Sequence, residues 1–225
     1  MNKMIIDKEN IKFKDEVIKI ELNINKLTID IEGNVTLNEI STKEENLTLN
    51  INLKPNSKLI FNRFKIDKNS NIEINLIQEE NSILNFNYSS IIKDKTNIKV
   101  NSILKGDNNT TNINIKAVTE ENGKCEIASE ADIKPNIKDN KLLESIRVVL
   151  LNDEESIVLP NLLVSSNEVE VNHAATLSGI DKEYLFYLNS KGISEKNAIN
   201  LIKKGYLLNN LEVDNTIKEE INNMI

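Results

Sequence analysis

The sequence has one cysteine, one histidine and no tryptophan among its 225 residues. The single cysteine excludes a disulfide within the chain. Together with the single histidine, it also excludes a structural zinc site built from four cysteines, or from two cysteines and two histidines. A metal site that needs two histidines, such as the HExxH motif of metalloproteases, is excluded as well.

Arginine is scarce too, and the charge balance is acidic. The formal net charge is −7, and only Arg63 and Arg147 are arginines among 28 basic residues. Nucleic-acid-binding domains carry basic patches with arginine forks, so we expect no nucleic-acid partner. No stretch approaches the roughly 18 apolar residues of a membrane-spanning helix, and the first 16 residues contain no signal-peptide core. We therefore expect a cytoplasmic protein with no membrane partner.

Glycine and proline are few, with 6 and 3 residues. Tight two-residue hairpins favour Asn-Gly or Asp-Gly because type I′ turns need positive φ angles, and the only such pair is Asn122-Gly123. Asparagine is abundant, and its short polar side chain tolerates the left-handed conformation. A solenoid with asparagine at its corners fits this composition.

The sequence is rich in strict alternation of apolar and polar residues, from about residue 17 to 172. Period-two alternation with β-branched residues on one side predicts strands with one buried face. Strand starts that recur every ~10 to 25 residues are typical of a sandwich, a barrel or a β-solenoid, and no strict repeat motif decides among these. The clearest alternating runs are 17–24, 27–31, 47–53, 72–76, 84–88, 98–101 and 113–116.

The pattern changes in the last third of the chain. The second half of the segment 144–151 is continuously apolar, which is typical of a strand buried on both faces. Helical periodicity follows from about Thr176, where Asp181 can cap a first helix and Gly192 can end it. We therefore expect a β body over residues 1–176 and a helical region over 177–225. Three helices are expected. The first covers 182–188, the second begins at 194–196 and is interrupted or ended by Gly205, and the third covers about 214–223.

One motif in this last third is specific. It reads LPNL over 159–162, VEVNHAAT over 169–176 and IDKEYLFYLNSKGI over 180–193. Over the ungapped stretch from His173 to Gly192 it resembles the SufB/SufD family, whose members are iron–sulfur cluster assembly factors. The resemblance extends back to about residue 120 and covers about half of the chain.

The resemblance implies a mainly β fold, with a right-handed parallel β-helix (solenoid) core and a small C-terminal α-helical region. It also implies a non-enzymatic subunit of a SufBCD-type complex, which binds a SufC-type ATPase and dimerises with a SufB/SufD-type paralogue or with itself. The chain has neither GxxxxGK[ST] nor GxGxxG, so ATP hydrolysis is expected of the partner. The large N-terminal helical domain of longer members is expected to be absent, because alternation begins near Val17.

His173 is the residue to which the resemblance assigns a part in cluster assembly at the subunit interface. Imidazole is a good metal ligand or proton carrier at neutral pH. The alternative is a strand-end histidine satisfied by a backbone partner. We expect no stably bound cofactor, and a transient iron–sulfur cluster at a subunit interface.

Two positions depart from the SufB pattern. SufB members carry a glutamate directly after this histidine, where the present chain has Ala174. They also carry a reactive cysteine on a preceding strand, and the matching position here is Ser145 or Ile146. Neither replacement binds iron as a thiolate does, so the chain resembles SufD more than SufB.

Three further features are candidates. Cys125 could supply one of the four thiolates that a typical cluster needs, with core packing as the alternative. Glu170 alternates with Glu168 and could be an acid–base group or an iron ligand, with an exposed polar face as the alternative. An aromatic segment could dock the ATPase, with packing against the β body as the alternative. It comprises Tyr184, Leu185, Phe186 and Tyr187.

Two other classes of function compete with cluster assembly. A β-solenoid structural or interaction module would keep the same fold, with His173 and Cys125 serving packing. A β-helix hydrolase acting on polysaccharide would need acidic residues clustered on successive coils. The acidic residues form no set at equal spacing, so the interaction module is the stronger of these two alternatives.

Overall fold

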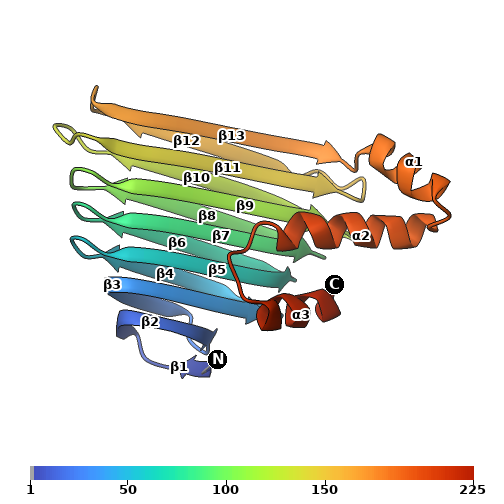
Figure 1. The fold of residues 1–225 in the computed structure, drawn as a ribbon, viewed down its shortest axis with the longest axis horizontal. Helices are drawn as coiled ribbons and strands as arrows, with labels where there is room; N and C mark the ends of the chain where they lie inside the picture. Colours follow the sequence, from blue (N-terminus) through green and yellow to red (C-terminus); the bar gives the residue numbers. More distant parts are fainter. Residues whose placement is uncertain (1–2) are drawn as a thin grey trace.

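The computed structural model describes residues 3–225 as a parallel β-solenoid of thirteen strands followed by three helices (Figure 1). The strands are β1 (Lys3–Ile6), β2 (Asn10–Leu22), β3 (Lys26–Ser41), β4 (Asn46–Leu53), β5 (Lys58–Asp67), β6 (Ser70–Gln78), β7 (Ile83–Ile92), β8 (Lys95–Leu104), β9 (Thr110–Thr119), β10 (Lys124–Ile133), β11 (Asn140–Leu150), β12 (Ile157–Val164) and β13 (Val169–Gly179). The helices are α1 (Lys182–Ser190), α2 (Glu195–Leu208) and α3 (Asn215–Met224). The mainly β solenoid class with C-terminal helices is therefore confirmed.

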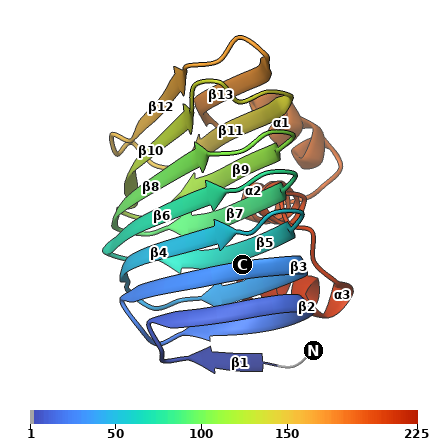
Figure 2. The same ribbon diagram turned by 90° about the vertical axis from the view of Figure 1, so that its left-hand side faces the viewer.

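The strands form two faces that meet at β3. Even-numbered strands from β4 to β12 pair in order on one face, and odd-numbered strands from β5 to β13 pair in order on the other. The first part of β3, 26–31, pairs with β4, and its second part, 34–41, pairs with β5. Figure 2 shows the even-numbered and odd-numbered strands alternating up the stack.

The alternating residues divide between the interior and the surface, as predicted. In β4, Leu49 and Ile51 are fully buried, and Asn50 between them is partly exposed. Leu49 pairs with Ile74 of β6 in register, so buried side chains of successive coils stack on one another. Strands begin before the alternation near Val17, since β1 covers Lys3–Ile6 and β2 begins at Asn10. At the other end, β13 continues to Gly179, three residues past the expected end of the β body.

Asparagine occupies the corners of the coils, as the composition indicated. Eight non-glycine residues in the described part of the chain have positive φ, and five of them are asparagines: Asn56, Asn69, Asn81, Asn108 and Asn136. The Asn122-Gly123 pair serves a different purpose. A Cβ atom at Gly123 would lie 1.9 Å from the carbonyl oxygen of Ile92, so only glycine permits this close approach.

Helices α2 and α3 lie against the sheet of odd-numbered strands, whereas α1 projects beyond the end of β13 (Figure 1). A second buried cluster joins these two helices to the sheet. It contains Phe64, Ile91, Val118, Leu207, Leu211, Ile217 and Ile221. Asp181 caps α1 as predicted, and α2 runs through Gly205 to Leu208 instead of breaking there. Within residues 3–225, no helix is long and apolar enough to cross a membrane.

Substitution of a corner asparagine tests the role of the left-handed positions. Asn56 has a φ of 60°, a region in which a side chain with Cβ costs roughly 1–2 kcal/mol. Asn56→Ala should lower the free energy of unfolding in urea by roughly 1 kcal/mol. Asn56→Gly should leave it within about 0.5 kcal/mol, because glycine adopts this conformation freely. Equal losses in both variants would show that the asparagine side chain itself, and not the backbone angle, is what matters.

Candidate functional site

The last coil of the solenoid, formed by β12 and β13, is open on its outer side. In the described structure β12 pairs only with β10, and β13 only with β11. One edge of each strand therefore presents backbone N–H and C=O groups without a strand partner. β13 contains neither lysine nor proline, the residues that commonly protect an edge, and Glu170 is its one acidic residue. Such an edge is a template for pairing with a strand of another chain.

Exposed apolar side chains border this open coil. They are Ile157, Leu159, Leu163 and Val164 on β12 and Leu177 on β13. Exposed apolar patches are a common mark of interaction sites. The open coil therefore offers a partner both an unpaired strand edge and apolar side chains.

His173 lies in the middle of β13, not at the strand end that the sequence predicted. It pairs in register with Glu144 of β11, so the two side chains share the inward face. His173 is exposed because no further coil covers it. Behind it, the buried Glu144 accepts a hydrogen bond from the Ser129 hydroxyl of β10, which crosses the interior.

The carboxyl group of Glu144 responds to this environment. Burial raises its pKa, while the hydrogen bond from Ser129 and the charge of His173 act in the opposite direction. A carboxylate that accepts the ring N–H of a ligating histidine orients it, and Glu144 is the register neighbour of His173. Sequence reasoning missed Glu144 and Ser129 because their inward direction depends on the strand register.

Glu170 lies on the opposite face of β13 from His173, because the two residues are three positions apart and the side chains of a strand alternate. It forms a surface ion pair with Lys141 at 3.3 Å. Glu168 precedes β13 and pairs with Lys138 at 3.4 Å. The structure therefore does not bring Glu170 and His173 together.

Cys125 lies on the inward face of β10 and is 4% exposed. Burial raises the pKa of its thiol to about 11, so the thiol is protonated at neutral pH. Ser129, the group behind His173, lies four residues further along β10, roughly 13 Å away. Cys125 and His173 are therefore separate features of the interior.

Helix α1 presents the predicted aromatic segment to solvent. Tyr184, Phe186 and Tyr187 are 66%, 74% and 57% exposed, and Leu185 is half-buried. The helix has no buried residue and contacts α2. Packing against the β body therefore does not account for these aromatic side chains, which form an exposed surface beside the open coil.

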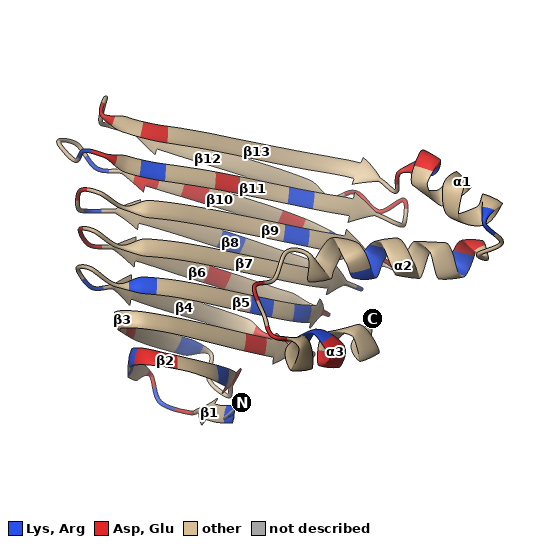
Figure 3. Ribbon diagram, in the orientation of Figure 1, with Lys and Arg blue, Asp and Glu red and all other residues tan. Residues whose placement is uncertain are grey.

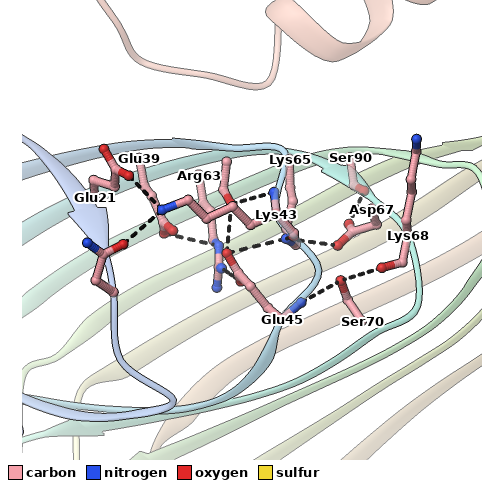
Figure 4. A network of polar contacts seen from close by, with 12 residues as sticks. Glu21, Glu39, Lys43, Glu45, Arg63, Lys65, Asp67, Lys68, Ser70 and Ser90 are labelled. Atoms are coloured by element: carbon pink, nitrogen blue, oxygen red, sulfur yellow. Dashed lines mark hydrogen bonds and ion pairs between the residues drawn. The ribbon is translucent and has the colours of Figure 1, made fainter. Parts of the chain in front are cut away.

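A second polar cluster lies inside the solenoid near its N-terminal coils (Figure 4). Arg63 forms ion pairs with Glu39, at 3.1 Å, and with Glu45. Lys65 lies 3.3 Å from Glu45 and 3.6 Å from Asp67. The sequence contains a signal for this cluster. Arg63, Lys65 and Asp67 follow Leu59 and Phe61 at every second position of β5, and therefore lie on the same face as these buried residues.

Burial dominates the electrostatics of this cluster. It raises the pKa of Glu39 to about 7, although the charge of Arg63 opposes the shift. Burial also raises the pKa of Asp67, against the charge of Lys65 and hydrogen bonds from Ser90 and Tyr88. In the described part of the chain, no group of three or more histidine, cysteine or acidic side chains is arranged to hold a metal ion.

A known protein family matches more than half of this chain. Residues 48–206 match the family described as "SUF system FeS cluster assembly, SufBD core domain". The chain belongs to the SufBD family. The matched region begins in β4 and ends in α2, so it contains the open coil, His173 and the aromatic helix.

Individual relatives are similar over shorter or more divergent stretches. The iron–sulfur cluster assembly protein SufD of Plasmodium falciparum (isolate 3D7) is 26% identical over 255 residues, covering 89% of this chain and 17% of that protein. A SufBD family protein of Pyrococcus horikoshii is 39% identical over 64 residues, covering 28% of this chain and 14% of that protein. A SufBD family protein of Staphylococcus saprophyticus is 28% identical over 106 residues, covering 47% of this chain and 23% of that protein. The chain thus spans less than a quarter of the length of these relatives.

The raised pKa of Glu144 predicts a pH-dependent stability. The folded protein holds the proton more tightly than the unfolded chain, so the contribution of this group is full below an unfolded pKa of about 4.3 and declines as pH rises through the folded value. Glu144→Gln cannot ionise and should gain stability over the parent as pH rises from about 4 to about 7. Urea unfolding at both pH values measures this, with exposed Glu126→Gln as control. The same pH response in both variants would contradict the prediction.

Proposed function

We propose that this SufBD family chain acts as a SufD-like, non-enzymatic subunit of a SufBCD-type complex that assembles iron–sulfur clusters. The observation that carries the proposal is the unprotected edge of β13, with His173 at the centre of that strand. A second SufB/SufD-type chain, or another copy of this one, pairs along this edge. The apolar side chains that border the open coil become buried in the same contact.

The cluster is cargo in this proposal and not a resident cofactor. The chain has a single cysteine and a single histidine, so the remaining cluster ligands come from the partner. His173 lies on the inward face at this edge, next to Glu144, its register partner on β11. Both groups are positioned by β-strands, which hold a ligand more precisely than a loop does.

The two departures from the SufB pattern support the SufD-like part of the proposal. Ser145 and Ala174, the two positions that depart from SufB, are register partners on β11 and β13. Ile146 faces inward and is fully buried, which favours Ser145 as the counterpart of the SufB cysteine. A cysteine and a glutamate at these two positions would lie side by side, and this chain has neither.

A SufC-type ATPase is the proposed partner of helix α1. Three exposed aromatic side chains on one short helix provide the kind of anchor that dominates protein interfaces. The chain has no phosphate-binding loop, so ATP hydrolysis belongs to the partner in this proposal. We place the complex in the cytoplasm, in line with the expectation from the sequence.

The alternative is a β-solenoid interaction module without a direct role in cluster assembly. The buried and protonated state of Cys125 favours it, because a neutral thiol in the core serves packing. This alternative keeps the partner surfaces and removes the role of His173. The following substitution distinguishes the two.

His173→Ala should reduce the iron–sulfur cluster content of the reconstituted complex and leave the fold intact. The side chain is exposed, so its loss should change the free energy of unfolding by no more than about 0.5 kcal/mol. Cluster content by absorbance and melting temperature are measured on the same preparation. Asn172→Ala, an exposed neighbour on the other face of β13, is the control. A destabilised His173→Ala with normal cluster content would favour the interaction module.

Phe186→Ala should weaken binding to the SufC-type ATPase without affecting stability. Phe186 is 74% exposed, and loss of a central aromatic anchor costs at least about 2 kcal/mol, or roughly thirtyfold in affinity. The matched control is Val17→Ala, because Val17 is 64% exposed on β2, in the N-terminal part of the solenoid. Binding measured by titration that is equal in the two variants would exclude α1 as the docking surface.

A further inference from the structure

A polar pocket of about 390 Å³ lies on the outer face of the odd-numbered strands, next to the loop between α2 and α3. It is separate from the proposed His173 site, because it lies on the opposite face of β11 from Glu144. Its lining includes Asn114, Lys116, Ser145, Arg147, Asn210 and Glu212. Basic positions on β9 and β11 lie next to each other beside this loop (Figure 3).

Lys116 and Arg147 place two positive charges side by side in this pocket. They are register partners on β9 and β11, and adjacent strands lie about 4.8 Å apart. Like charges directly opposite one another on neighbouring strands destabilise a sheet. Neither group forms an ion pair with a carboxylate anywhere in residues 3–225.

The nearby carboxylate does not neutralise the pair. The Oε1 atom of Glu212 accepts hydrogen bonds from the amides of Asn85 and Asn87, at 3.1 and 3.2 Å. These bonds direct the Oε1 atom of Glu212 toward the asparagines of β7. The two cations are therefore left facing the pocket in a protein whose net charge is −7.

Tyr206 of α2 contacts both basic residues, through the side chain of Lys116 and the backbone of Arg147. The Lys116 ammonium lies 5.0 Å from the centre of the Tyr206 ring and donates to the Tyr206 carbonyl at 3.4 Å. The Tyr206 hydroxyl donates to the backbone carbonyl of Arg147 at 2.8 Å. Burial and the charge of Arg147 lower the pKa of Lys116, so the uncompensated charges have an energetic cost. A bound anion would remove this cost.

We propose that this pocket binds a phosphate group through Lys116 and Arg147. The planar guanidinium group donates two parallel hydrogen bonds to an oxyanion, and the ammonium group adds a second positive charge. The Ser145 hydroxyl lies on the same face of β11, two residues from Arg147, and is a further donor. The pocket is open and polar, so both a free phosphate ion and the phosphate of a nucleotide are compatible with it.

Inorganic phosphate is the first probe. At constant ionic strength it should raise the melting temperature of the full chain, compared with chloride. Lys116→Met keeps the aliphatic stem over Tyr206, and Arg147→Gln keeps a polar side chain. Each should weaken phosphate binding by about tenfold or more, since a hydrogen bond to a charged group is lost. Lys99→Gln, an exposed lysine on β8, removes the same charge elsewhere and should bind phosphate normally.

A second readout does not depend on ligand. In phosphate-free buffer, Lys116→Met should be at least as stable as the parent chain, because it relieves the repulsion between the two cations.

Adenosine monophosphate distinguishes the sources of phosphate. Equal affinity for the nucleotide and for phosphate identifies the phosphate group as the recognised part, and tighter nucleotide binding that is lost in Arg147→Gln identifies a nucleotide ligand. If neither probe binds, or if Lys99→Gln weakens binding as much as Arg147→Gln, the proposal is wrong.

Discussion

The in-register parallel ladder of backbone hydrogen bonds is the interaction on which the rest of the structure depends. Each strand pairs with the strand one coil earlier, and a slip of one residue would turn the apolar side chains out of the interior. The same register builds the outer surface. Ile66, Ile91, Val118 and Val149 align across four odd-numbered strands and form the apolar surface on which α2 packs. The helical region therefore rests on a side-chain column that exists only because the coils are aligned.

The two ends of the solenoid differ in their buried charged residues. Near the N-terminal coils, Arg63 and Lys65 are fully buried and tie β5 to carboxylates of β3 and of the segment before β4. Removing one partner from such a buried pair costs about 3–5 kcal/mol, because the other charge remains buried and uncompensated. At the C-terminal coil no comparable network closes the interior, and Glu144 has His173 beside it at the exposed edge. Internal charges therefore stabilise the coils near the N-terminal end, and the C-terminal coil has no such network among the residues that the structure describes.

The sequence predicted the features that depend on local pattern. Alternation located β2, β3, β4 and β6 to β9, asparagine indicated the corners, and Asp181 marked the start of α1. It did not predict features that depend on register between distant strands. Arg63 lies on β5, which none of the predicted alternating runs covered, and its ion pairs with Glu39 and Glu45 depend on how β5 stacks on β3. The proximity of Lys116 and Arg147 likewise depends on alignment across a full coil. His173 was recognised by its motif, but its position in mid-strand and the carboxyl group behind it were not.

Strand β11 relates the two sites. Its inward residue Glu144 stands behind His173, while its outward residues Ser145 and Arg147 line the phosphate pocket. The column that contains Lys116 and Arg147 continues in register to Thr176 of β13, which lies at the open edge. A partner strand added there would extend this column, and would come next to Thr176 on one face and to His173 on the other. A partner at β13 would therefore extend the inward and the outward surfaces together, because the single strand pair of β11 and β13 carries both.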